Sequence, residues 1–228
     1  MSTPTRLVSL GAAALLIVGL TACTAEPEEA APLPTSPVVQ LGAPGEPNRT
    51  LSPEEAAGIG SPTYVEQDVL FVRDMLHHHS QAIQMTGYVD ERTTDDDIRL
   101  LAERMNVSQT DEITQLETWL QTRGEPVRDP DDSHAHTAES MPGLLTEAEL
   151  AELEAADGEE FERLFLAYMI RHHEGALTMV ERLFATAGAA QEPELAGFAN
   201  DVDADQRAEI RRMRALLDKM SDRAGAGL

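Results

Sequence analysis

A doubled histidine–methionine phrase constrains this 228-residue chain more than any other feature of its sequence. Both copies read M-x2-H-H-x5-M, and their equivalent positions are Met75, His78, His79 and Met85 in the first copy and Met169, His172, His173 and Met179 in the second. Imidazole and thioether groups are ligands for copper-like metals. The duplication predicts one metal site built from the two halves of an internally repeated fold.

The repeat continues into a second segment of each half. Gln109-x2-Glu112 parallels Gln206-x2-Glu209, and the region after residue 50 is rich in the helix formers Ala, Leu, Glu and Arg. Alternating strand patterns are missing there. We therefore predict an all-α domain at 51–228, a four-helix bundle made from two duplicated αα-hairpins over about 61–123 and 146–222.

Capping and breaking residues predict the limits of the helices. The expected helices are a lead-in helix from Ser52-Pro53, a long helix from Ser61-Pro62 to about Val89, a second from Thr94 to Gly124, a short one from Thr146 to about Ala156, a long one after Gly158 to about Ala187, and a last one from Pro193 to about Asp222. Residues 125–143 are expected to form a loop.

Helical geometry predicts how the phrase is displayed. At about 100° per residue, Met75, His78, His79 and Ala82 share one face, while His77 lies on the opposite, solvent-facing side. The two histidines of a pair diverge by about 100°, so each points at a different neighbouring helix. A complete site therefore needs ligands from the other repeat.

The methionines are assigned less sharply than the histidines. Met75 and Met85 lie about 15 Å apart along the helix axis, so they cannot share one ion. Either there is more than one site, or one methionine of each phrase only fills the core. For Met85 and Met179 packing and ligation are equally good interpretations, and Ala82 and Ala176 leave room beside the imidazoles.

The first 22 residues have the features of a bacterial secretion signal, with Arg6 ahead of an apolar run from Leu7 to Leu20. The run ends Leu-Thr-Ala-Cys23, which resembles the lipobox in which the cysteine is lipidated. Cys23 is the only cysteine of the chain. We predict a lipoprotein signal peptide over 1–22 and lipidation of Cys23; a plain signal peptide with an incidental cysteine is the alternative.

Residues 23–50 are proline-rich and poor in apolar side chains, which predicts a disordered, lipid-anchored tether. The protein is then extracytoplasmic and reaches the cell membrane through its lipid alone. The formal net charge of −24 argues against nucleic acid as a partner and suits the attraction of cations.

Two further sets of polar residues can be interpreted either as parts of a functional site or as ordinary solvent-exposed residues. His134 and His136, near Met141, form an accessory metal site in one interpretation and a solvated polar loop in the other. Gln109 and Gln206 either hydrogen-bond the imidazoles or lie on the surface.

The residues Asp74-Met-Leu-His-His-His-Ser-Gln-Ala-Ile-Gln-Met85 and their counterpart Phe165 to Met179 resemble the two signature helices of a bacterial family, domain of unknown function 305. Met141 to Thr146 and Trp119-Leu120 also match its habits, and the resemblance covers about 61–222. It implies a ferritin-like bundle and copper binding through the histidines and methionines named above, because some members are linked to periplasmic copper binding and tolerance. His77 departs from the family, which commonly has proline there.

These observations predict a copper-binding lipoprotein that sequesters or carries copper in copper homeostasis. Thioether with imidazole favours Cu(I), while Cu(II) and Zn(II) remain open. No nucleophilic triad or phosphate-binding loop is recognised, so no enzymatic activity is expected. A copper-delivery partner and a homo-oligomer are both compatible with the sequence.

Two alternatives remain. The first is a metal-free helical interaction module in which the histidines are hydrogen-bonded within the core. The second is a di-iron oxidase on the ferritin-like fold, but that chemistry needs Glu-x-x-His pairs, and no glutamate lies three residues before any histidine here.

Overall fold

The computed structural model describes residues 38–40, 47–58, 63–128 and 141–226, which belong to two units that divide after Gly60. Helices predominate in these ranges, which confirms the predicted all-α class. None of the helices in the described ranges is long and apolar enough to cross a membrane. The predicted signal segment and Cys23 lie outside the described residues, so lipidation stays a prediction.

The first unit contains a short strand pair and one helix. Strands β1 (Val38–Gln40) and β2 (Arg49–Leu51) pair antiparallel, with Val39 opposite Thr50. This pairing lies within the segment expected to be a disordered tether, where β-branched residues favour strands. Helix α1 (Pro53–Gly58) begins as predicted, because Ser52 and Glu55 exchange two hydrogen bonds in a capping box, of 3.2 and 2.9 Å.

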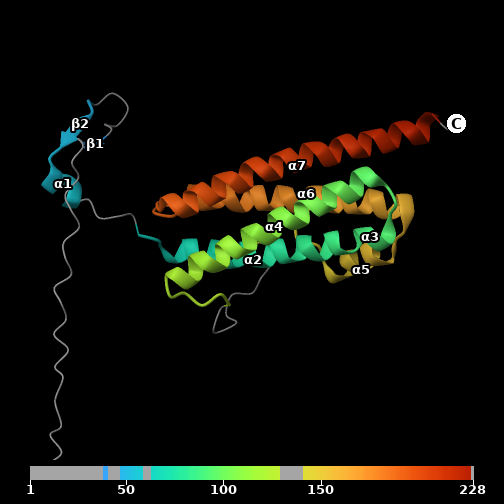
Figure 1. Cartoon of the computed structure of the whole chain (residues 1–228), viewed down its shortest axis with the longest axis horizontal. Helices are drawn as coiled ribbons and strands as arrows, with labels where there is room; N and C mark the ends of the chain where they lie inside the picture. The colour runs from blue at the N-terminus through green and yellow to red at the C-terminus, as the bar shows by residue number, and fades with distance from the viewer. Residues whose placement is uncertain (1–37, 41–46, 59–62, 129–140, 227–228) are drawn as a thin grey trace, which may run out of the picture. The chain divides into compact units, whose positions relative to one another are not determined.

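The second unit is helical in all the elements described. Its helices are α2 (Glu66–Gly87), α3 (Val89–Arg92), α4 (Asp96–Thr122), α5 (Glu147–Ala155), α6 (Gly158–Ala185) and α7 (Pro193–Ala226). The long helices lie side by side, with α2 packed on α4 and α6 packed on α7 (Figure 1). Helix α2 also contacts α6, and α4 contacts α7, so the two helical pairs face each other.

Helix α2 begins at Glu66, later than the Ser61-Pro62 start expected from the sequence. The reason is the carboxylate of Asp68, which accepts a hydrogen bond from the backbone N–H of Val65 at 3.0 Å. Val65 is therefore the N-cap residue of α2. Its other oxygen accepts from the N–H of Ala190 at 2.8 Å. Buried Asp68 therefore fixes the start of α2 and attaches it to the connection between α6 and α7.

The remaining limits are close to those expected. Asp95, not Thr94, caps α4, because its carboxylate accepts from the N–H groups of Asp97 and Ile98 at 2.9 and 3.2 Å. Thr146 and Glu149 form the predicted capping box of α5. Helix α7 begins at Pro193 as predicted.

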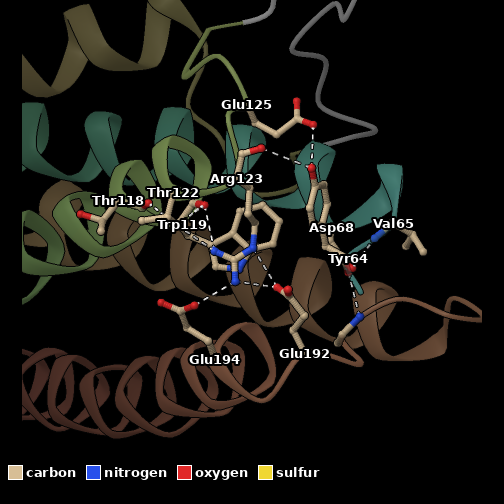
Figure 2. Close-up of polar contacts among 11 residues, drawn as sticks. Tyr64, Val65, Asp68, Thr118, Trp119, Thr122, Arg123, Glu125, Glu192 and Glu194 are labelled. Atoms are coloured by element: carbon tan, nitrogen blue, oxygen red, sulfur yellow. Dashed lines mark hydrogen bonds and ion pairs between the residues drawn. The ribbon is translucent and has the colours of Figure 1, made fainter. Parts of the chain in front are cut away.

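Arg123, at the end of α4, joins the two helical pairs at one end of the unit (Figure 2). Its guanidinium lies 4.2 Å from the centre of the Trp119 ring and donates to Glu192 and Glu194, each at 2.9 Å. Glu192 precedes α7 and Glu194 lies in its first turn. Tyr64 adds a hydrogen bond to Glu125 at 3.2 Å.

The core of the second unit is divided into two apolar clusters. One includes Val72, Trp119, Val180 and Val202, and the other includes Val89, Met105, Phe165 and Met213. Each long helix contributes to both clusters, and between its two contributions each carries buried polar residues. These are His78 and His79 on α2, Gln109 and Glu112 on α4, His172 and His173 on α6, and Gln206 and Glu209 on α7. We call these eight residues the polar layer.

Candidate metal centre

The four histidines of the doubled phrase are brought together in the polar layer. They come from α2 and α6, and each is at most 1% exposed. His77 is exposed, as predicted, and the equivalent Arg171 is partly exposed and paired with Glu149 at 2.6 Å. The phrase therefore turns its paired histidines inward on both helices.

The inner histidines, His78 and His172, face each other across the contact between α2 and α6. Their ring centres are 3.7 Å apart and their planes are tilted by 38°. His78 Nε2 lies 3.3 Å from the carbonyl oxygen of Pro142, to which it donates when it carries the proton. The two helices that carry the doubled phrase therefore meet directly through these two rings.

The outer histidines, His79 and His173, turn toward the partner helix of their own hairpin. His79 Nε2 lies 2.5 Å from Glu112 Oε2 on α4, and His173 Nε2 lies 2.7 Å from Glu209 Oε2 on α7. The His173 contact is aligned as a hydrogen bond, whereas the His79 contact is short but not so aligned. The two halves of the centre thus repeat the same histidine–glutamate pair.

Burial sets the protonation of the inner pair. Loss of hydration holds the pKa of His78 well below its usual range, and repulsion from His79 lowers it further. The pKa of His172 is also lowered well below its usual range, first by burial and then by His78. Both rings are neutral at pH 7, and a neutral imidazole keeps a lone pair for a metal ion.

Most imidazole nitrogens of the layer have no hydrogen-bond partner. The unpartnered atoms that are clear of any carboxylate are Nδ1 of His78, His79 and His173, and both nitrogens of His172. Buried polar groups normally find partners, because an unpaired one costs about 1–3 kcal/mol. Such a concentration of orphaned nitrogen donors fits a soft or borderline metal ion such as copper.

The structure does not assemble these donors into a finished coordination sphere. Within the described ranges, no three side chains of His, Cys, Asp or Glu are arranged to hold a metal ion. Met75 and Met169 are fully buried and lie in separate apolar clusters, as do Met179 and Met85. Their role as ligands therefore stays a prediction, and packing is the role that the structure displays.

The 141–143 segment is pressed against α6 beside the inner histidines. A β-carbon on Gly175 would lie 1.7 Å from the carbonyl oxygen of Pro142, and one on Gly143 would lie 2.5 Å from that of Arg171. Gly143 also has a φ of +87°, which favours glycine. These two glycines allow the Pro142 carbonyl to reach His78. Met141 is fully buried in the first apolar cluster.

The predicted accessory residues His134 and His136 lie outside the described residues, so that site stays a prediction. Gln109 and Gln206 are each 2% exposed, so the surface interpretation of them is wrong. Their Oε1 atoms have no hydrogen-bond partner. They belong to the polar layer, but no hydrogen bond to an imidazole is formed.

Glu112 and Glu209 were not singled out as site residues from the sequence. The sequence did contain a signal for these glutamates, because both occur at the same position of the repeated Gln-x2-Glu phrase. Glutamate is seldom buried unless it is paired, which made an inward position unexpected. They are 8% and 7% exposed.

The fold and the site define an all-α protein with a buried cluster of histidines between two helical pairs. The family described as Domain of unknown function (DUF305) matches residues 68–217, most of the chain. The chain belongs to the DUF305 family, which confirms the resemblance seen in its signature helices.

Solved structures agree with this assignment. A DUF305 fragment from Deinococcus radiodurans is 35% identical, with a TM-score of 0.61, over 69% of this chain and 99% of that one. A DUF305 protein from Streptomyces coelicolor, described as a predicted secreted protein, is 30% identical, with a TM-score of 0.61, over 68% of this chain and 94% of that one. CopM in its Cu(I)-bound form is 27% identical, with a TM-score of 0.54, over 67% and 96%. Comparison with curated proteins finds no match.

Proposed function

We propose that this protein binds copper in its polar layer and sequesters or carries it outside the cytoplasm. The observation that carries the proposal is the set of buried imidazole nitrogens without hydrogen-bond partners, contributed by α2 and α6. Neutral imidazoles with free lone pairs are ready to ligate, whereas a metal-free core would leave each of them unsatisfied.

The relatives support a soft metal ion such as copper, since CopM also has Ag-bound forms, 26% and 25% identical to this chain. CopM has been crystallised in Cu(I)-bound and Cu(II)-bound forms, and these are 27% and 26% identical to this chain. On chemical grounds Cu(I) is the favoured ion if Met75 or Met169 joins the histidines, because thioethers are soft ligands. Cu(II) and Zn(II) suit the histidines together with the two carboxylates.

The remaining parts of the proposal concern architecture and location. We take the long helices to form a ferritin-like four-helix bundle from two duplicated hairpins, with the chain anchored outside the cytoplasm by lipid on Cys23. The predicted secretion of the Streptomyces coelicolor relative supports this location. The role is binding without catalysis, with the metal ion as the first partner and a copper-delivery protein as a further one.

The test is an anaerobic Cu(I) titration against a chromophoric chelator, with Zn(II) alongside. Residues 24–228 retain every described residue and no cysteine, so any Cu(I) bound is not held by a thiolate. We expect tight binding that is lost when His78, His79, His172 and His173 are all changed to alanine. His77→Ala is the matched control, since His77 is exposed on the same helix.

Unchanged stoichiometry in the fourfold variant would contradict the proposal. Failure of the wild-type protein to compete with the chelator would do so as well. Either result would favour a metal-free interaction module, in which the histidines serve only the core.

A further inference from the structure

We propose that Glu112 and Glu209 are positioning residues of the metal centre. Each directs the Nε2 proton of its outer histidine, His79 or His173, toward its carboxylate and so presents Nδ1 as the metal-binding atom. This inference rests on the proposed copper binding and goes further, because it names the ligating nitrogen and the residues that select it.

The contacts of the two rings select the tautomer. Nε2 of His79 lies 2.5 Å from the Glu112 carboxylate, and Nε2 of His173 lies 2.7 Å from that of Glu209. An ionised carboxylate only accepts hydrogen bonds, so the ring nitrogen that faces it is the one that carries the proton. Nδ1 of both rings then carries the lone pair, and both Nδ1 atoms are buried without a partner.

An outer histidine is paired with a glutamate in both helical pairs, as an aligned hydrogen bond for His173 and as a close contact for His79. Each glutamate follows a buried glutamine by three residues, on the second long helix of its own hairpin. In the first repeat the Ser108 hydroxyl donates to the second oxygen of Glu112 at 3.3 Å and helps to orient the carboxylate. Two buried glutamates at equivalent positions each contact an outer histidine, which indicates that both have the same positioning role.

Metal-ligating histidines commonly donate their other ring N–H to a carboxylate, which fixes the ring and makes the ligating nitrogen more basic. Losing such a partner typically weakens metal binding about 10- to 100-fold. The inner histidines differ, because His78 Nε2 faces a backbone carbonyl and His172 has no partner on either nitrogen. The carboxylates therefore act on the outer ring of each half.

The first experiment reads the tautomers directly. Long-range ¹H–¹⁵N correlation spectra of the metal-free, ¹⁵N-labelled 24–228 chain at pH 7.5 should show His79 and His173 with the proton on Nε2. Added Cu(I) should then shift Nδ1 of both rings. A proton on Nδ1 in the metal-free protein, or a Cu(I)-induced shift confined to Nε2, would overturn the proposal without any variant having to fold.

The second experiment uses Glu112→Leu and Glu209→Leu, which keep much of the side-chain volume and remove the hydrogen-bond acceptor. Each should weaken Cu(I) binding about 10- to 100-fold. Each should also alter the tautomer of its own histidine and leave the other repeat unchanged. Glu103→Leu is the matched control, because it removes the same carboxylate from an exposed site on α4.

The outcomes separate this inference from the proposed function. If the wild-type protein binds no Cu(I), the proposed function fails, and the tautomers of the metal-free protein still test the geometry. If the wild-type protein binds Cu(I) and both leucine variants bind it equally well, the positioning role alone is wrong. Loss of affinity with unchanged tautomers would likewise overturn it, because a structural or general charge effect would then suffice.

Discussion

Gly175 on α6 and Pro142 in the preceding segment are in such close backbone contact that a β-carbon on Gly175 would stand 1.7 Å from the Pro142 carbonyl oxygen. That same oxygen lies 3.3 Å from Nε2 of His78. The absence of a side chain at Gly175 therefore allows the Pro142 carbonyl to lie beside His78 of the polar layer.

We expect Gly175→Ala to destabilise the protein by at least about 1–3 kcal/mol, because the 141–143 segment has to move away from α6. Urea unfolding measures the loss. The control is Gly197→Ala on α7, where a β-carbon meets nothing within 4 Å. That change should stabilise the helix by about 0.5–1 kcal/mol. Equal stability of the Gly175 variant and the wild type would show that the close contact is absent.

Asp68→Ala should destabilise the protein by about 1–3 kcal/mol, because the N–H groups of Val65 and Ala190 both lose their acceptor. Asp68→Asn keeps one acceptor oxygen and should lose less. Thermal unfolding gives the ranking, and amide hydrogen exchange should show Ala190 losing protection. An Asn variant as unstable as the Ala variant would contradict the argument from hydrogen bonds.

The ion pair of Glu149 and Arg171 predicts a dependence on pH. The hydrogen bond from Arg171, with a second from the Thr146 backbone, lowers the pKa of Glu149 from 4.5 to about 2. A carboxyl with a lowered pKa stabilises the folded state above its unfolded pKa, and this stabilisation is lost as the pH falls toward 2.

The melting temperatures of the wild type and Glu149→Gln should therefore differ most above about pH 5 and converge as the pH is lowered from 4.5 toward 2. Calorimetry at several pH values checks this. A difference that stays constant over the range would mean that the charge of Glu149 contributes nothing.

Arg123→Lys should cost about 0.5–2 kcal/mol, because lysine cannot stack its charge flat on Trp119 while donating to two carboxylates. Trp119 is the only tryptophan of the chain, so its fluorescence reports the change directly. Arg99→Lys serves as the control, since Arg99 pairs with Asp90 on the surface and should cost less than about 1 kcal/mol. Equal losses of stability in both variants would rule out a contribution from the stacking of Arg123 on Trp119.

The sequence was sufficient to predict the inward histidines because helical periodicity fixes which side chains share a face. His78 and His79 diverge as expected, and exposed His77 lies away from them. The start of α2 could not be predicted in the same way. It depends on Asp68, whose second hydrogen-bond partner, Ala190, is remote in the chain.

Glu112 and Glu209 escaped prediction for a related reason. Whether a glutamate on an amphipathic helix turns inward depends on the partner that meets it, and that partner lies on another helix. The contact of Pro142 with His78 could not be predicted either, since every residue has a backbone carbonyl and the residue type does not show which one will contact a side chain. Contacts between separate segments decided these positions.

The divided core also affects how the sequence can change. Val72 and Phe165 lie in different clusters, with the polar layer between them. Cores tolerate hydrophobic exchanges that conserve volume, so each cluster can be refilled independently while the helix spacing holds. Apolar substitutions at either end of the unit therefore leave the polar layer in place, so chains with quite different cores can carry the same buried histidines.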